Sequence, residues 1–161
     1  MPDGLIIFLC AAGLVAALLL LKYATGGDAF SAYRQKRLMT RHEMVMYKKL
    51  VRAISGTSYI VCPQVCMGAV MDVKTGIDNK KRLALRNRFD RKIIDFVIAD
   101  GDGRARLLIE LDDSSHVSSR DKDRDLLTSS AGYQTLRYRK AGSLDPRALR
   151  QDIAEIIRAQ N

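Results

Sequence analysis

The stretch LLIELDDSSH, residues 107–116, begins as an apolar run and ends in acidic residues and a histidine. The apolar start predicts a buried strand. Side chains alternate between the two faces of a strand, so Glu110 and Asp112 are expected on one face and Leu111 on the other. Two carboxylates on one face repel each other unless a cation lies between them. The stretch is therefore a candidate metal site, built from the hard oxygen ligands that Mg²⁺ prefers.

The preceding apolar segment supplies a third acidic residue. Residues 93–99, IIDFVIA, are apolar except for Asp95. Residues 100–103, DGDG, follow and are typical of a tight hairpin turn. In isolation, Asp95 would be interpreted as a turn cap or as a partner of Lys92. If the hairpin closes, however, Asp95 lies beside Glu110 on the neighbouring strand, and this favours a metal ligand.

The N-terminal residues 4–21 contain no charged residue and are almost entirely aliphatic. As a helix they span about 27 Å, which is enough to cross the hydrocarbon core of a bilayer. The start, Met1-Pro2-Asp3, lacks the basic residues of a secretory signal, and Lys22-Tyr23-Ala24 is a poor cleavage site, so we favour an uncleaved anchor. A signal peptide and a buried core helix are the alternatives. The basic residues that follow place the rest of the chain in the cytoplasm by the positive-inside rule.

We predict three parts: a transmembrane anchor (1–22), a basic juxtamembrane linker (23–37) and an α/β domain (38–161). The periodicity of the domain predicts a helix, three strands, a helix, a strand and a helix, which make a small mixed sheet flanked by helices. The net charge of +9 over 161 residues favours an anionic partner, which can be nucleic acid, acidic lipid or both. Of the three cysteines, Cys10 lies in the N-terminal apolar run, and Cys62 and Cys66 have no second pair nearby that would suggest a zinc site. We interpret Cys62 and Cys66 as small apolar strand residues in a reducing compartment.

Residues 80–92, KKRLALRNRFDRK, form a basic run with two interpretations. The first is a solvated helix surface, which charge runs usually are. The second is a phosphate-contacting surface beside the acidic strands. In the second case the contacts would be Lys80, Lys81, Arg82, Arg86, Arg88, Arg91 and Lys92.

Glu43 also has two interpretations. Thr40 and Glu43 have the spacing of a capping box at the start of a helix, which gives Glu43 a structural role. Alternatively, Glu43 contributes one more carboxylate to the metal site from that helix.

Several motifs, taken in order, resemble the restriction-endonuclease-like PD-(D/E)XK superfamily. The closer resemblance is to its very-short-patch-repair-endonuclease-like branch and, within that branch, to the domain-of-unknown-function family 2726. The resemblance covers roughly Leu38 to Arg139 and is carried by Ile94-Asp95-Phe96, Ile109-Glu110-Leu111-Asp112-Asp113 with His116, Asp121-x-x-Arg124, Gly132-Tyr133 and Leu136-Arg137. It implies a restriction-endonuclease-like fold in which the strand acids hold Mg²⁺ or Mn²⁺ for the hydrolysis of nucleic acid phosphodiesters.

The resemblance also carries a departure. Asp112 occupies the place where many relatives have a catalytic lysine, and a carboxylate cannot stabilise the charge that a lysine would. By the resemblance, His116 would transfer protons, and Lys122 or Arg124 would supply the missing cation. Arg124 would also contact nucleic acid. Two functions follow: a membrane-anchored, cytoplasm-facing nuclease-like domain that acts on DNA, or a catalytically degenerate module that binds nucleic acid or a protein at the membrane. A third is a membrane accessory protein whose basic residues contact lipid.

Overall fold

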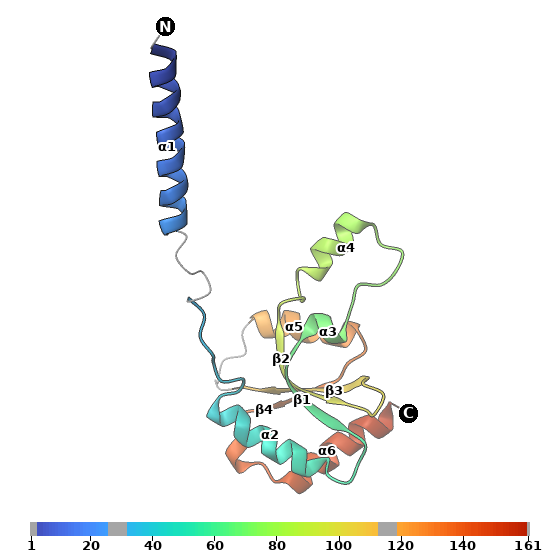
Figure 1. Cartoon of the computed structure of the whole chain (residues 1–161). Coiled ribbons are helices and arrows are strands. Elements are labelled where there is room, and N and C mark those ends of the chain that lie inside the picture. Colours follow the sequence, from blue (N-terminus) through green and yellow to red (C-terminus); the bar gives the residue numbers. More distant parts are fainter. Residues whose placement is uncertain (1–2, 26–31, 113–118, 161) are drawn as a thin grey trace. The chain divides into compact units, whose positions relative to one another are not determined.

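The computed structural model describes residues 3–25, 32–112 and 119–160 (Figure 1). The chain divides into two compact units, Met1–Arg37 and Leu38–Asn161. The first unit contains helix α1 (Asp3–Thr25). Its segment Gly4–Tyr23 is long and apolar enough to cross a membrane, and none of it is buried against protein. By length and composition, the unit contains one candidate membrane span.

The second unit is a mixed α/β domain, as the periodicity predicts. Its four strands form one sheet in the order β1-β2-β3-β4. Strand β2 pairs antiparallel with β1 and with β3, and β4 runs parallel to β3. The elements in chain order are α2 (Arg41–Ala53), β1 (Ile60–Cys66), α3 (Met67–Val70), α4 (Asn79–Arg86), β2 (Ile93–Ala99), β3 (Ala105–Leu111), α5 (Ser119–Ser130), β4 (Thr135–Tyr138), the 3₁₀ turn η2 (Ala141–Ser143) and α6 (Pro146–Ala159).

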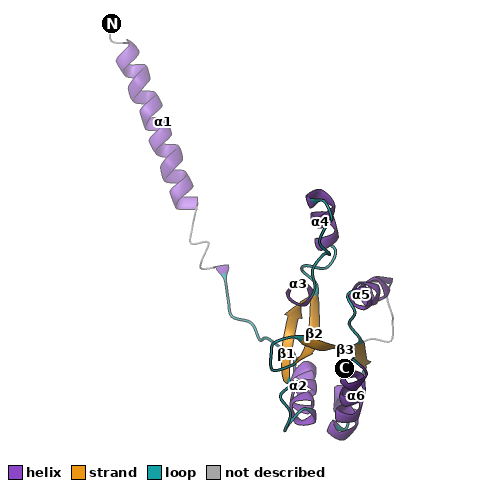
Figure 2. Ribbon diagram, turned by 90° about the vertical axis from the view of Figure 1, so that its right-hand side faces the viewer, coloured by secondary structure: helices purple, strands orange, loops and turns teal. Residues whose placement is uncertain are grey.

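Helices cover both faces of the sheet (Figure 2). On one face, α2 and α6 pack through residues such as Leu50 and Ile153 against Phe96 and Ile109 of the central strands. On the other face, α3 and α5 join a smaller core around Leu108. Both clusters follow from the alternation of β3, because Leu107, Ile109 and Leu111 enter the larger core and Leu108 enters the smaller one. Glu110 therefore lies on the same face of the sheet as Leu108.

The β2–β3 hairpin forms as the DGDG turn predicts. Gly103 has φ +78°, a left-handed conformation that glycine adopts without a Cβ penalty. Asp100 accepts hydrogen bonds at Oδ1 from the backbone N–H groups of Asp102 and Arg104, which tightens the turn. The strands then pair with Phe96 opposite Ile109. This register brings the preceding residue of β2 and the following residue of β3, Asp95 and Glu110, to neighbouring positions.

Two segments differ from the expected boundaries. The alternation of residues 133–139, YQTLRYR, predicts a strand over that whole range, but β4 spans only Thr135–Tyr138. Tyr133 instead donates a hydrogen bond from its hydroxyl to the carbonyl of Val70, which joins the start of this strand to α3. The basic run forms only a short helix, α4, before turns lead into β2. Asp145-Pro146 predicts an N-cap followed by a first-turn proline for the last helix, and α6 starts in this way.

The capping box at the start of α2 is present. Thr40 Oγ1 accepts a hydrogen bond from Glu43 N at 3.2 Å, and Thr40 N donates to Glu43 Oε2 at 2.5 Å. The second carboxylate oxygen of Glu43 accepts from Gln64 Nε2 at 3.0 Å. Both oxygens of Glu43 therefore take part in local contacts, which favours the structural interpretation.

We expect Thr40→Ala to lower the free energy of unfolding by about 1 kcal/mol, because one N–H of the first turn loses its acceptor. Glu43→Gln should cost less, since glutamine also serves at the third position of a capping box. Urea unfolding of the full chain in detergent measures both changes. If Glu43→Gln left stability intact but abolished divalent-cation binding, the structural interpretation would be wrong.

Candidate functional site

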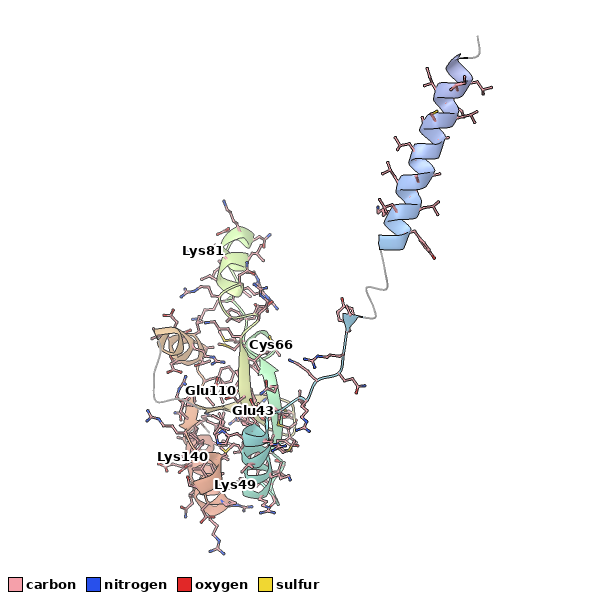
Figure 3. The ribbon with its side chains drawn as sticks, turned by 90° about the vertical axis from the view of Figure 1, so that its left-hand side faces the viewer. Glu43, Lys49, Cys66, Lys81, Glu110 and Lys140 are labelled. Carbon is pink, nitrogen blue, oxygen red and sulfur yellow. The ribbon has the colours of Figure 1, made fainter. Side chains whose placement is uncertain are left out.

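Asp95 and Glu110 form a carboxylate pair on the face of the sheet that α5 covers. Asp95 Oδ2 accepts a hydrogen bond from the backbone N–H of Leu111 at 2.8 Å, which fixes this carboxylate against the end of β3. The Asp95 carboxylate lies close enough to Glu110 to raise the pKa of that residue. Figure 3 shows Glu110 at the sheet. The neighbouring positions that the hairpin predicts are therefore confirmed.

Glu110 is buried, with only 7% of its side chain exposed. Burial raises the pKa of Glu110 to about 8, and the nearby Asp95 carboxylate acts in the same direction, while Arg124 and Arg137 oppose it. Glu110 is therefore mostly protonated at neutral pH in the metal-free protein.

Arg124 of α5 brings a guanidinium to this pair. Its Nη2 lies 3.5 Å from Glu110 Oε1 and also donates a hydrogen bond to the carbonyl of Ile93. Its Nε is buried and has no hydrogen-bond partner among the residues that the structure describes. The sequence motif Asp121-x-x-Arg124 predicts a cation near the acids, and Arg124 occupies that position.

Arg137 is the residue that sequence reasoning missed. It lies opposite Glu110 in the β3–β4 register. Its Nη1 is 3.3 Å from Asp112 Oδ1, and its Nη2 is 2.5 Å from Asp125 Oδ1 on α5. Arg137 thus links the end of β3, the edge strand β4 and helix α5. The sequence contained a signal, since Leu136-Arg137 is part of the family resemblance, but nothing in it indicated which acids Arg137 would contact.

The described residues bring only part of the predicted site together. Asp95 and Glu110 meet, whereas Asp112 pairs with Arg137. Within residues 3–25, 32–112 and 119–160, no group of three or more His, Cys, Asp or Glu is placed to hold a metal ion. His116 lies outside the described residues, and so does the side chain of Lys122, although its backbone belongs to α5. The metal-binding and catalytic roles of these residues stay predictions.

The structure divides the basic run into two groups. Arg82 and Arg86 turn toward Asp72, at 2.7 and 3.3 Å, and Arg86 also pairs with Asp90 at 3.2 Å. The pKa of Asp72 is lowered, chiefly by a hydrogen bond from the backbone N–H of Val73. The positive charges of Arg82 and Arg86 act in the same direction. Of the remaining cations in the run, Lys92 is half-buried. The exposed ones are Lys80, Lys81, Arg88 and Arg91.

Comparison with known families matches residues 35–156 to the family described as "Protein of unknown function (DUF2726)". No curated protein and no solved structure matches the chain. The matched range includes every strand of the sheet and both pairs of acids and arginines described above. It is the family that the motifs of Asp95, Glu110 and Arg124 predict, whereas membership of the wider nuclease superfamily stays a prediction. The chain therefore belongs to the DUF2726 family.

Proposed function

We propose that this chain is a membrane-anchored nuclease-like domain that faces the cytoplasm and hydrolyses nucleic acid phosphodiesters with the help of Mg²⁺ or Mn²⁺. The observation that carries the proposal is the Asp95–Glu110 pair, in which Glu110 is buried and Asp95 is half-buried. Burying a carboxylate beside a second carboxylate is costly unless a proton or a cation lies between them. Such pairs with a strongly raised pKa occur preferentially at functional sites.

The pair fits the ligand preference of Mg²⁺. This ion is usually bound by one or two carboxylates and keeps waters or substrate phosphates as its other ligands. Asp95 and Glu110 supply two carboxylates, and Asp95 is already oriented by the backbone N–H of Leu111. Binding of a divalent cation would release the proton of Glu110. The proposed ligands are Asp95 and Glu110; Asp112, the third ligand that the sequence predicts, pairs with Arg137.

The cations around the pair have distinct roles in this proposal. A bound Mg²⁺ would polarise the phosphodiester and neutralise the charge that develops on it. Arg124 supplies a second positive charge at Glu110 and replaces the lysine whose place Asp112 takes. Arg137 neutralises Asp112 and Asp125, which would otherwise repel a phosphate. His116 and Lys122 are proposed to transfer a proton and to contribute a further cation.

We expect the full chain in detergent to cleave DNA with Mg²⁺ or Mn²⁺ and to stop when the metal is chelated. Asp95→Asn and Glu110→Gln should each lower the rate about 100-fold or more, because even residues that only support metal ligands contribute 10–100-fold. Asp102→Asn, in the exposed β2–β3 turn, is the matched control and should change nothing. Cleavage that persists in chelator, or that survives both substitutions, would contradict the proposal.

The proposed orientation rests on the flanks of α1. Lys22 follows the apolar segment and further basic residues continue to Arg41, whereas Asp3 precedes it. A C-terminal fusion to a reporter that is active only in the cytoplasm should be active in the full chain. An inactive fusion, paired with an active periplasmic or extracellular reporter, would reverse the orientation.

A second candidate is a catalytically degenerate module that binds nucleic acid or a protein. The observation that favours it is that arginines of the chain itself already contact Glu110 and Asp112. Such a module would retain DNA in a salt-dependent way. Its retention would be the same with and without chelator and would not change in Glu110→Gln, whereas the nuclease-like domain requires metal at that residue.

A further inference from the structure

The segment between β1 and β2 stands away from the sheet as an arm, residues 71–92, with α4 at its far end. Figures 1 and 2 show α4 beyond α3 on the same side of the sheet. No residue of α4 is buried. An eight-residue helix is only marginally stable on its own in water, so local contacts must hold it.

Those contacts come from two acids of the arm, Asp78 and Asp72. Asp78 caps the helix by accepting a hydrogen bond from the backbone N–H of Lys81 at 3.1 Å. Asp72 pairs with both Arg82 and Arg86. The two arginines of α4 therefore brace the arm and are directed to one side of the helix.

The opposite side of α4 presents a different set of side chains. At 100° per residue, Lys80, Lys81 and Ala84 lie on the side of the helix away from Arg82 and Arg86, and Leu83 lies at the edge of that side, next to Lys80. All four are exposed, and Leu83 is 61% exposed. Lys81 is labelled at the far end of the arm in Figure 3. We call these four residues the outward face of α4.

From this we infer that the outward face of α4 docks on the anionic surface of a lipid bilayer. An exposed leucine at the edge of a face that carries two lysines suits that surface, because leucine enters the boundary of the acyl chains while the lysines stay with the headgroups. Each lysine near an anionic leaflet contributes about fivefold to binding. The two arginines of α4, Arg82 and Arg86, which could fork onto phosphates, pair with Asp72 instead.

A bilayer is also close at hand in the same chain. Helix α1 is apolar enough to span one. Residues 26–40, which connect α1 to α2, can extend to at most about 50 Å. A tether of this length gives the membrane a high effective concentration at the domain, so a weak contact is sufficient. The inference rests on α1 as a membrane span and not on the nuclease chemistry. Of the phosphate contacts predicted above, it assigns Lys80 and Lys81 to lipid instead.

The sequence contains no tryptophan, so Leu83→Trp places a single fluorescent reporter on this face. The full chain carrying Leu83→Trp is placed in nanodiscs of phosphatidylcholine with or without phosphatidylglycerol, with brominated acyl chains as the quencher. We expect a blue-shifted emission and strong quenching in the anionic discs. Adding Lys80→Glu and Lys81→Glu should lower the bound-to-free ratio about 30-fold or more, since two lysines are lost.

Two matched controls accompany this measurement. Leu126→Trp places the reporter on an equally exposed leucine of α5 and should not be quenched. Lys48→Glu with Lys140→Glu removes two exposed lysines elsewhere and should leave the quenching of Leu83→Trp unchanged. The inference is overturned if Leu83→Trp emits as in water in both kinds of disc, if Leu126→Trp is quenched equally, or if duplex DNA and not anionic lipid changes the emission.

Discussion

Glu110→Gln is expected to stabilise the metal-free protein at pH 8.5 by about 2–4 kcal/mol and to have a much smaller effect at pH 5. The folded protein raises the pKa of Glu110 from 4.5 to about 8, chiefly through burial. Between these values the folded state holds one more proton than the unfolded state, so stability is present below pH 4.5 and is lost as the pH rises toward 8. Glutamine is neutral at every pH, so the variant does not lose this stability as the pH rises.

Urea unfolding of the wild type and of Glu110→Gln, in chelator and at both pH values, measures the effect. The same difference at pH 5 and pH 8.5 would mean that Glu110 is not the buried acid described here. Adding Mg²⁺ at pH 8.5 should recover stability in the wild type, because a ligand that binds only the folded state stabilises it. The recovery should be absent in Glu110→Gln.

Arg137→Met is expected to lower the free energy of unfolding by about 2–4 kcal/mol. Removing one partner of a fully buried ion pair costs more, but the Arg137 side chain is 27% exposed, so water screens part of the charge that is left behind. The substitution leaves Asp112 and Asp125 without the guanidinium that pairs with both of them. Arg137→Lys should recover only part of the loss, because an ammonium cannot fork to two carboxylates as a guanidinium does.

The neighbouring Arg139→Met is the matched control, since Arg139 is exposed, and it should change stability by less than about 0.5 kcal/mol. Combining Arg137→Met with Asp112→Asn and Asp125→Asn should restore part of the stability, because the uncompensated charges are then removed. Equal effects of Arg137→Met and Arg139→Met would show that Arg137 does not hold these elements together.

The parts of the site that the sequence predicts are those set by local rules. The DGDG turn and the alternation of two short strands place Asp95 beside Glu110, because a tight hairpin leaves little choice of register. The capping box of α2 is likewise contained within four residues. Each of these features depends on neighbours in sequence, and each is confirmed.

The partner of Asp112 could not be predicted in this way. Arg137 reaches Asp112 only because β4 runs parallel to β3 after the α5 crossover. The same limit applies to the basic run, where Asp72 pairs with Arg82 and Arg86, and Lys80 and Lys81 remain exposed. Periodicity gives the faces of one element, but contacts between distant elements require the fold.

Calorimetric titration of the full chain in detergent with Mg²⁺ or Mn²⁺ at pH 7 tests most directly whether the Asp95–Glu110 pair binds a divalent cation. Running it in two buffers of different ionisation enthalpy also counts the protons released. We expect one saturable site that releases roughly one proton per ion, with binding lost in Asp95→Asn and in Glu110→Gln. No saturable binding, or binding that survives both substitutions, would contradict the site.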